Sequence, residues 1–370
     1  MSGRNSAPLR PQTFSPPQPL EHAEEMHKTA LAIGADGKGL LAADESTGSI
    51  KKRLEKVGKD NTEDNRREWR DVMFTAEGDF ESHISGIIMF EETLMKHDSR
   101  LESSKYKGKP FVDIIKSRGI IPGIKVDKGT VALPRTDPEE TTTQGLDGLL
   151  DRCKTYYDRG ARFSKWRSTY IVSATTPSSL AIMDNAEVLA RYAAISQQAG
   201  LVPIVEPEVL MTHHQSIERS IEAHIAAYSA LFERLALHKV DLASLVLKAS
   251  MVTPGDKYAG GKADPEQVGE ATVHVLAKTV PPLVPTIVFL SGGFSDADSI
   301  AYLNAINQQK QKNPRRAPWA LTFSFGRALQ GVAMEAWAKG DIKDSQSKWC
   351  DRAKWCGQAA QGKYKGECPS

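Results

Sequence analysis

Eight short apolar segments, which start about every 33 to 46 residues, constrain the fold of this chain more than any other feature. Several of them lack polar residues at alternate positions, which is typical of strands buried on both faces. We interpret each segment as one strand. The segments are GLLAAD (39–44), SGIIMFEE (85–92), IIPGIKVD (120–127), ARFSKWRSTYIV (161–172), LVPIVEPEV (201–209), LASLVLKASMV (242–252), TIVFLSGG (286–293) and WALTFSFGRA (319–328).

Helical patterns fill the intervals between these segments. Residues 184–199 and residues 213–238 each place their apolar side chains on one stripe of a helix. Because alternating strands and helices imply a parallel sheet, the pattern predicts an α/β protein. Eight such units within about 300 residues favour a closed barrel over an open sheet. We therefore expect a single (β/α)8 TIM barrel with an N-terminal arm and a C-terminal helical tail.

The expected organisation has three parts: a flexible, Pro-rich arm over residues 1–20, a catalytic barrel over residues 21–345, and a C-terminal helix and tail over residues 346–370. The arm lacks the apolar core of a secretory signal. No apolar stretch approaches the ~20 residues that a membrane span needs. A cytoplasmic location is the simplest interpretation, although Arg4, Arg10 and the serines of the arm leave organellar targeting open.

Charge and metal-ligating residues exclude several classes of partner. The net charge is only +2, which favours neither nucleic acid nor an anionic membrane as a partner. The four cysteines form no C-x-x-C pair, and the nine histidines are scattered along the chain. We therefore expect a reducing compartment and no metal or other cofactor.

Polar side chains gather at the ends of the predicted strands, where the chemistry of a (β/α)8 barrel takes place. Lys165 and Arg167 are two residues apart and therefore lie on one face, as do Glu206 and Glu208. Every predicted strand except the second contributes such a group. The set comprises Asp44, Lys125, Asp127, Lys165, Arg167, Glu206, Glu208, Lys248, Ser291, Ser324 and Arg327.

Three lysines and two arginines in one barrel mouth predict an anionic substrate. The nearby carboxylates are expected to offset only part of the repulsion between these cations, and phosphate is the anion that fits best. The segments SGG (291–293) and SFGR (324–327) place small residues where backbone N–H groups can approach an oxyanion, and Arg327 adds several donors. Ser49, Arg53 and Lys125 are candidates for a second anion group.

Lys248 stands at the end of an otherwise apolar strand, which suggests a nucleophile. A free lysine has a pKa of about 10.4, so only about one in a few thousand is neutral at pH 7. Burial and a second ammonium both lower the pKa of a lysine, and Lys165 is the expected second ammonium. A neutral lysine can attack a ketone and form an iminium, and Glu206 is the best candidate for the required proton shuttle.

With these residues, the chain closely resembles class I fructose-bisphosphate aldolases, the Schiff-base type. The resemblance runs from about residue 21 to 364, and no single motif carries it. The stretch LASLVLKAS differs from the LEGTLLKPN of many members. The matching stretches include GKGLLAADESTGSIKKR, GIKVDKG, TTTQGLDGL, PSSLAIMDNA, LARYAAISQQAGLVPIVEPE, LKASMVTPG, FLSGG, LNAIN and PWALTFSFGRALQ.

The resemblance implies reversible cleavage of fructose 1,6-bisphosphate to dihydroxyacetone phosphate and glyceraldehyde 3-phosphate, in glycolysis and gluconeogenesis. It implies small phosphosugar substrates, metal independence and a homotetramer. Lys248 resembles the Schiff-base lysine, Glu206 the proton acceptor and donor, Lys165 the assisting cation, and Asp44 the carboxylate at the C4 hydroxyl. The implied C1-phosphate residues are Ser291, Gly292, Gly293, Ser324, Gly326 and Arg327. The implied C6-phosphate residues are Ser49, Arg53, Lys125 and Arg167, with Arg66 less clearly, and we add Glu208 to the substrate-binding set.

Four other functions compete with this interpretation. A transaldolase or deoxyribose-phosphate aldolase shares the lysine chemistry but needs only one phosphate site. A glycosidase could use Glu206 with Asp44, although so many cations suit a neutral sugar poorly. A metal-dependent aldolase needs clustered histidines. A scaffold protein without activity could tolerate the loss of Lys248, which is present here with its partners.

Overall fold

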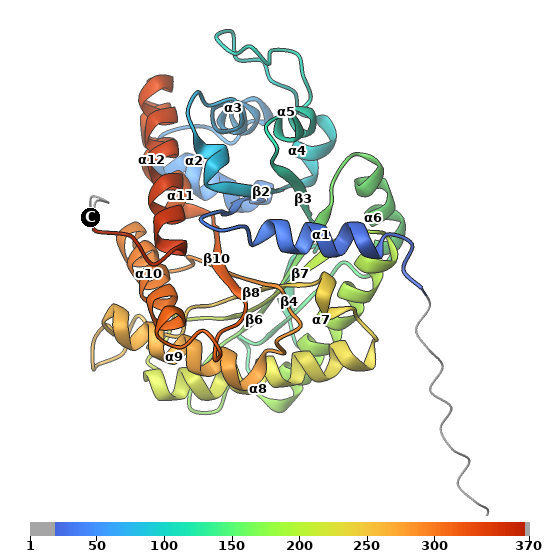
Figure 1. Ribbon diagram of the computed structural model, residues 1–370, viewed down its shortest axis with the longest axis vertical. Helices are drawn as coiled ribbons and strands as arrows, with labels where there is room; N and C mark the ends of the chain where they lie inside the picture. Colours follow the sequence, from blue (N-terminus) through green and yellow to red (C-terminus); the bar gives the residue numbers. More distant parts are fainter. Residues whose placement is uncertain (1–18, 367–370) are drawn as a thin grey trace, which may run out of the picture.

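Eight parallel strands close on one another in the order β1–β10–β9–β8–β7–β6–β3–β2. This barrel is seen in a computed structural model that describes residues 19–366 (Figure 1). The expected (β/α)8 architecture is therefore confirmed. The barrel strands are β1 (Gly39–Ala43), β2 (Ile84–Met89), β3 (Ile121–Lys125), β6 (Phe163–Tyr170), β7 (Val202–Val209), β8 (Val246–Ala249), β9 (Thr286–Phe289) and β10 (Ala320–Phe325).

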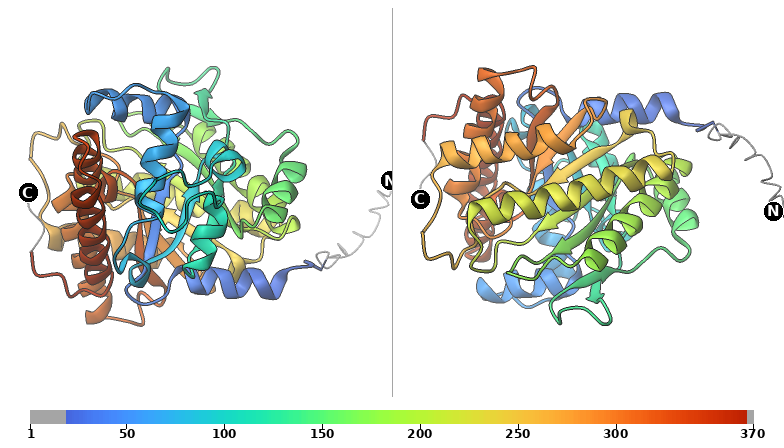
Figure 2. Two further views of the ribbon diagram at one scale, coloured as in Figure 1. Left: turned by 90° about the horizontal axis from the view of Figure 1, so that it is seen from above. Right: turned by 90° about the horizontal axis from the view of Figure 1, so that it is seen from below.

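Helices surround the barrel, and a small antiparallel hairpin of β4 (Thr130–Ala132) and β5 (Thr141–Thr143) lies between β3 and β6 in the chain. Figure 2 shows the long helices α7, α8 and α9 running across the outside of the strands. The helices are α1 (Ala23–Ile33), α2 (Thr47–Lys56), α3 (Glu63–Phe74), α4 (Glu91–Lys96), α5 (Phe111–Ser117), α6 (Leu149–Asp158), α7 (Ser179–Gln198), α8 (Ile217–Leu237), α9 (Pro265–Thr279), α10 (Asp296–Lys312), α11 (Arg327–Ala338) and α12 (Ile342–Ala360), with 3-10 turns η1 (Phe80–Ser82) and η2 (Leu242–Ser244).

The interior of the barrel is filled by apolar side chains at the start of the strands. Phe163, Val202 and Val246 belong to this inner core. Helix α1 adds Met26 and Ile33 to it. Because side chains alternate along a strand, the residues two and four positions further on face the same interior. The inner faces of β6, β7 and β8 thus change from apolar residues to charged ones toward their C-terminal ends.

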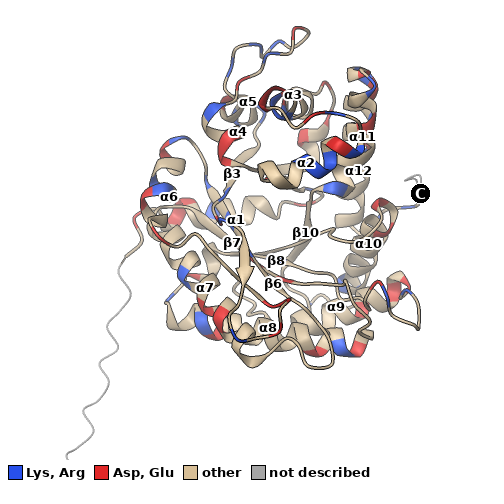
Figure 3. Ribbon diagram, turned by 180° about the vertical axis from the view of Figure 1, so that it is seen from behind, with Lys and Arg blue, Asp and Glu red and all other residues tan. Residues whose placement is uncertain are grey.

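One glycine makes room for this inner core. A Cβ atom at Gly123 of β3 would lie 2.1 Å from the ring of Phe163, which is far inside van der Waals contact. The larger, outer core lies between the strands and the surrounding helices. Figure 3 shows that most charged residues lie on the helices and loops of the molecule, with few on the strands. The charged residues inside the barrel are therefore exceptions that need a reason.

The segment 242–252 differs most from its predicted strand. Leu242–Ser244 form the 3-10 turn η2, because the carboxylate of Asp241 accepts hydrogen bonds from the backbone of Ala243 and the hydroxyl of Ser244. Only Val246–Ala249 form the strand.

Helix limits also differ from the sequence pattern. Ser178 and Ser216 cap α7 and α8, so these helices begin at Ser179 and Ile217 instead of residues 184 and 213. At the C-terminal end, α12 covers Ile342–Ala360, so this helix begins four residues before the expected start of the C-terminal helix and tail at residue 346. Residues 1–18 of the expected arm and residues 367–370 of the tail lie outside the described part of the chain. Within the described part, no helix is both long and apolar enough to cross a membrane.

Candidate active site

Three neighbouring strands bring their charged side chains to the same end of the barrel. In the parallel register, Arg167 of β6 lies beside Glu206 of β7, and Val205 of β7 lies beside Leu247 of β8. Lys165, Glu206 and Lys248 all face the interior, because each continues the inner face of its strand. The sequence therefore placed these residues correctly at one end of the barrel, and the structure brings their side chains into contact.

The four predicted catalytic residues form one buried group, which we call the catalytic cluster. Glu206 joins the two lysines: its Oε1 atom lies 3.1 Å from Lys248 Nζ, and its Oε2 atom lies 2.8 Å from Lys165 Nζ. Lys165 also donates a hydrogen bond of 3.0 Å to Asp44 Oδ2, which comes from the end of β1. All four residues are less than 10% exposed, at 3% to 8%.

Electrostatic coupling keeps the carboxylates of the catalytic cluster ionised. Burial alone would raise the pKa of Asp44, but the charges of Lys165 and Lys248 outweigh it and hold this pKa well below its usual range. The same two lysines lower the pKa of Glu206 against the effect of its burial. Burial would lower the pKa of Lys165, yet the charges of Asp44 and Glu206 raise it. Lys165 therefore stays a cation, and its nearest neighbours are carboxylates.

Charge compensation at the barrel mouth is more complete than the sequence suggested. Lys125 Nζ lies 2.9 Å from Asp127 Oδ1, and the guanidinium of Arg167 is paired with the carboxylate of Glu208. Each of the three lysines and Arg167 thus has a carboxylate partner. The expectation that acids offset only part of the repulsion is wrong for these four cations, because each of them contacts at least one carboxylate.

The residues after β9 form a surface that admits only small side chains. Gly293 has φ = +87°, and a Cβ atom there would lie 2.6 Å from the sulfur of Met211. A Cβ atom at Gly292 would lie 3.0 Å from Glu208 Oε1. A cavity of about 270 Å³ lies against both glycines and is also lined by Arg167 and Glu208. Backbone N–H groups here can therefore approach a ligand closely.

The neighbouring strand adds a helix terminus and a hydroxyl. Gly326 precedes α11, whose N-terminus starts at Arg327. Ser324 is 1% exposed, and its hydroxyl has no hydrogen-bond partner within residues 19–366. Arg327 donates a hydrogen bond of 2.6 Å to the Phe294 carbonyl, which ties it to the loop after β9. A helix N-terminus, an unpaired donor and an arginine together favour an anion at this point.

Arg53 lies closer to this surface than the sequence indicated. Its Nη2 atom would lie 3.5 Å from a Cβ atom at Gly326, so Arg53 borders the predicted C1-phosphate residues. Its guanidinium is bound by the carboxylate of Glu45. Ser49 lies in the first turn of the same helix, α2, where its hydroxyl is 3.1 Å from that of Ser46. Arg167 also lines the cavity beside Gly292 and Gly293, so two of the predicted C6-phosphate residues, Arg53 and Arg167, border the predicted C1-phosphate residues.

Arg66 is engaged elsewhere. Its guanidinium donates to both carboxylate oxygens of Glu92, at 2.8 Å and 2.7 Å, and to Asn61 at 3.1 Å. The structure therefore does not bring Arg66 into the catalytic cluster or next to the glycines after β9.

Sequence reasoning missed a second carboxylate network beside the catalytic cluster. Glu45 binds both Arg53 and the buried Arg70, and Gln330 donates to Glu45 at 3.1 Å and to the Ala42 carbonyl at 2.8 Å. The one signal for this network was that Glu45 directly follows Asp44 at the end of β1. Its partners come from α2, α3 and α11, which no sequence spacing connects.

Comparison with known proteins shows which family the chain resembles. The family model for class I fructose-bisphosphate aldolases matches residues 25–370. The chain is 48% identical over 347 residues to the cytosolic fructose-bisphosphate aldolase 6 of Arabidopsis thaliana, covering 93% of each chain. It is also 48% identical to fructose-bisphosphate aldolase C of Rattus norvegicus, covering 94% of this chain and 92% of the relative.

A solved structure is similar over nearly the same length. It is a fructose-bisphosphate aldolase from Plasmodium falciparum in complex with TRAP and a small molecule inhibitor. The TM-score is 0.88 at 44% sequence identity, and the match covers 94% of this chain and 97% of that one.

Proposed function

Because this chain belongs to the class I fructose-bisphosphate aldolase family, we propose that Lys248 forms the Schiff base through which it acts. The protein is a lyase that reversibly cleaves fructose 1,6-bisphosphate to dihydroxyacetone phosphate and glyceraldehyde 3-phosphate. The observation that supports the role of Lys248 most strongly is its contact of 3.1 Å with Glu206 at the end of the barrel.

The contact between Lys248 and Glu206 provides the proton transfers that iminium formation needs. Glu206 takes a proton from the Lys248 ammonium, and the neutral amine then attacks the C2 carbonyl carbon of the substrate. A second proton moves from the nitrogen to the new C2 oxygen and gives a carbinolamine. Glu206 returns its proton to the departing hydroxyl, so that water leaves and the positively charged iminium remains. The ammonium charge is conserved, and Glu206 is again ionised.

Asp44 and Lys165 serve the step that breaks the carbon–carbon bond. Asp44, which Lys165 and Lys248 keep ionised, accepts the proton of the C4 hydroxyl. The C3–C4 bond breaks, its electron pair moves to the iminium nitrogen, and glyceraldehyde 3-phosphate leaves. The enamine then takes up a proton at C3, which balances the proton that Asp44 accepted. Hydrolysis of the iminium releases dihydroxyacetone phosphate and Lys248.

Two phosphate-binding regions orient the substrate across this cluster. The C1 phosphate is placed at the residues after β9 and β10, where small residues, a helix N-terminus and Arg327 meet. The C6 phosphate is placed toward Lys125, Arg167 and Ser49, with Glu208 holding Arg167 in position. Arg53 lies between these regions, and Arg66 supports α4 through Glu92 instead of binding substrate directly.

Membership of the family supports the remaining parts of the proposal. The chain uses no metal for catalysis, because the iminium acts as the electron sink that a Lewis acid would otherwise provide. It acts as a homotetramer in the cytoplasm, where two of its plant relatives are named cytosolic. Residues 21–345 form the catalytic barrel, and the described residues from 346 onward add the terminal helix and the start of the tail.

Trapping with borohydride tests the central proposal. The enzyme is incubated with dihydroxyacetone phosphate and sodium borohydride, digested, and analysed by mass spectrometry. We expect one reduced adduct, on the peptide that contains Lys248. An adduct on Lys165, or activity that survives without any trapped lysine, would contradict the assignment.

A further inference from the structure

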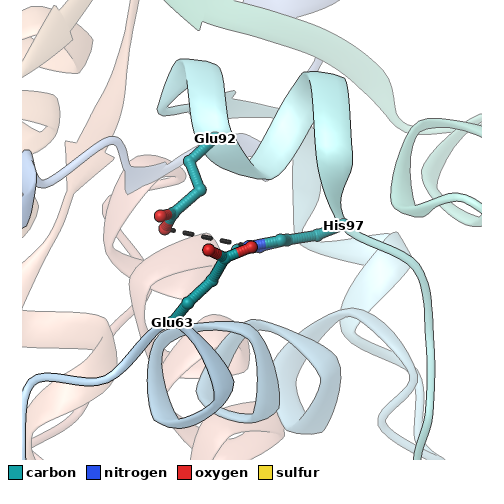
Figure 4. A group of neighbouring side chains, drawn as sticks. All are labelled: Glu63, Glu92 and His97. Carbon is teal, nitrogen blue, oxygen red and sulfur yellow. Dashed lines mark ion pairs between the residues drawn. The ribbon is translucent and has the colours of Figure 1, made fainter.

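A second cluster of carboxylate and nitrogen groups lies outside the barrel, where the start of α3 meets α4. It contains Glu63, the first residue of α3, Glu92 in the first turn of α4, and His97, which directly follows α4. Figure 4 shows the three side chains pointing toward one another. We call this group the α3–α4 cluster. None of these residues belongs to the substrate site described above.

His97 is buried without the hydrogen bonds that a buried imidazole normally makes. The residue is 4% exposed, and neither ring nitrogen has a hydrogen-bond partner among residues 19–366. The ring packs edge-on against Phe111, at 6.1 Å between ring centres, which holds its orientation. Leaving such a polar group unpaired is costly, and each case in a folded protein calls for an explanation.

The unpaired ring faces two carboxylates at a distance that leaves space between them. His97 Nε2 lies 3.8 Å from Glu63 Oε1 and 3.8 Å from Glu92 Oε1. Both distances exceed the reach of a hydrogen bond. Two ligand atoms that each bind one zinc ion at about 2.1 Å can be at most about 4.2 Å apart, so both separations suit a shared ion. One oxygen or nitrogen from each of the three residues lies within 4.8 Å of the others.

We propose that Glu63, Glu92 and His97 bind a divalent transition-metal cation, for which Zn²⁺ is the best fit. A nitrogen with two carboxylate oxygens is a donor set that suits zinc and similar ions, whereas calcium and magnesium prefer oxygen alone. Glu63 is 59% exposed at its side chain, so it can move the last few tenths of an ångström toward the ion. Water can then complete the coordination from the solvent side.

Arg66 orients the second carboxylate. It donates to Glu92 Oε1 and Oε2 at 2.8 Å and 2.7 Å. A carboxylate oxygen has lone pairs for more than one partner, so Oε1 can accept from Arg66 and still bind an ion. Hydrogen bonds of this kind to ligating carboxylates are usual around metal sites. The positive charge of Arg66 also repels the ion and weakens its binding. We therefore expect a dissociation constant on the order of micromolar.

The proposed ion joins two elements and plays no part in the cleavage reaction. An ion held between Glu63 and His97 ties the N-terminus of α3 to the end of α4, just before the loop that leads to α5. We therefore expect the ion to stabilise this part of the outer layer and to leave aldolase activity unchanged.

Zinc binding to metal-free protein tests the proposal. The full chain is treated with a chelator, dialysed, and titrated with zinc chloride in a calorimeter at neutral pH. We expect one equivalent to bind, and a rise in Tm of about 3 °C when zinc is present at about 100 times its Kd. Glu63→Gln should weaken this binding by at least about 10-fold, since the amide loses the ligand charge.

Asp64→Asn is the matched control. Asp64 is the next residue along α3, is 78% exposed, and pairs with Arg67 and Arg100 instead of facing His97. Asp64→Asn removes the same charge as Glu63→Gln, and it should change the Kd for zinc by less than about twofold. His97→Gln should abolish the one-equivalent binding, and circular dichroism checks that this variant is folded. Because Glu63 is at the surface, Glu63→Gln keeps the test valid even if the buried variant does not fold.

Two results would overturn the proposal. The first is wild-type protein that binds no zinc up to about 100 μM, far above the expected Kd. The second is Glu63→Gln that binds zinc as tightly as the wild type, which would place the ion elsewhere. Neither result bears on Lys248, because borohydride trapping is measured separately on the same preparations.

Discussion

Two clusters in this molecule combine buried nitrogen groups with carboxylates, and they differ in how closely these groups approach one another. In the catalytic cluster, the contacts of Glu206 with Lys165 and Lys248 are 2.8 Å and 3.1 Å. In the α3–α4 cluster, His97 lies 3.8 Å from each of its two carboxylates. Lys165, Lys248 and His97 are all buried, so the nitrogen groups of the two clusters differ in these distances and not in burial.

The two distances correspond to two kinds of chemistry. Groups in direct contact can pass a proton between them, and the carboxylates of the catalytic cluster balance its buried charges without an added ion. Groups held 3.8 Å apart cannot exchange a proton directly, but the space between them can hold a metal ion. A carboxylate beside a nitrogen is therefore not sufficient to assign a function. Substitutions at the active site and chelation test this contrast.

Removing the nucleophile should have the largest effect. Lys248→Met should lower the rate of cleavage by about 10⁵-fold or more and abolish the trapped adduct, because no iminium can form. Lys312→Met is the control: this lysine is 60% exposed on α10 and pairs with Glu266, so activity should stay within about twofold. Cleavage assays and mass spectrometry measure both quantities. Adduct formation by the Lys248 variant would mean that a different lysine reacts.

Removing the proton shuttle should have a smaller effect. Glu206→Gln keeps Lys248 but cannot accept its proton, so adduct formation should slow by about 10²–10⁴-fold. The measurement is the rate of borohydride trapping in a quenched-flow experiment. A rate equal to that of the wild type would show that another group moves the proton.

Replacing Lys165 should change the dependence on pH. Lys165 lowers the pKa of Glu206 and Asp44, so Lys165→Met should raise both values. The acid side of the plot of trapping rate against pH should then move to higher pH, because Glu206 becomes protonated at a higher pH than in the wild type. Trapping rates measured from pH 5 to 9 test this shift. An unchanged profile would exclude electrostatic control of the carboxylates by Lys165.

The same variant also has a stability signature. A carboxyl whose folded pKa is depressed contributes stability above its unfolded pKa of about 4 and loses it as pH falls. With Lys165 gone, the two folded pKa values lie closer to the unfolded value, so the variant should lose less stability than the wild type as pH falls below about 4. Near neutral pH it should be less stable by about 3–5 kcal/mol, because two buried carboxylates lose a partner. Urea titrations at several pH values measure both changes.

The two phosphate regions should respond differently to two substrates. Arg327→Ala should reduce kcat/KM for fructose 1-phosphate and for the bisphosphate by about 10–100-fold, since both carry the C1 phosphate. Lys125→Met should reduce kcat/KM mainly for the bisphosphate, because only that substrate carries a C6 phosphate. Steady-state kinetics with both substrates decide the matter. Equal losses from both variants would argue against separate regions.

Chelation should have the smallest effect on activity. EDTA should remove any ion from the α3–α4 cluster and lower Tm by about 3 °C, while cleavage stays within about twofold. Activity and thermal unfolding are measured on one sample before and after treatment. A loss of activity that zinc restores would contradict both the iminium mechanism and the separation of the two clusters.

Much of the active site could be predicted because the barrel converts sequence order into position. Lys165, Glu206 and Lys248 follow apolar stretches of parallel strands, so their side chains had to meet at one end of the barrel. Arg66 shows where this reasoning stops. Its residue type and place in the chain resemble a phosphate ligand, yet its long side chain binds Glu92 on another helix. A flexible cation takes the nearest carboxylate in space, which the sequence does not reveal.

The sequence by itself determined the barrel, the direction of its strands and the end at which the reactive groups gather, because hydrophobic periodicity and strand parity are local properties of the chain. Only the tertiary structure decided which charges are paired. Glu45 binds Arg53 and Arg70, and Glu63 meets His97, across turns and helices whose relative positions depend on packing. Whether two long side chains make contact depends on differences of about 1 Å in the positions of their helices. These positions are decided only when the helices pack on the barrel.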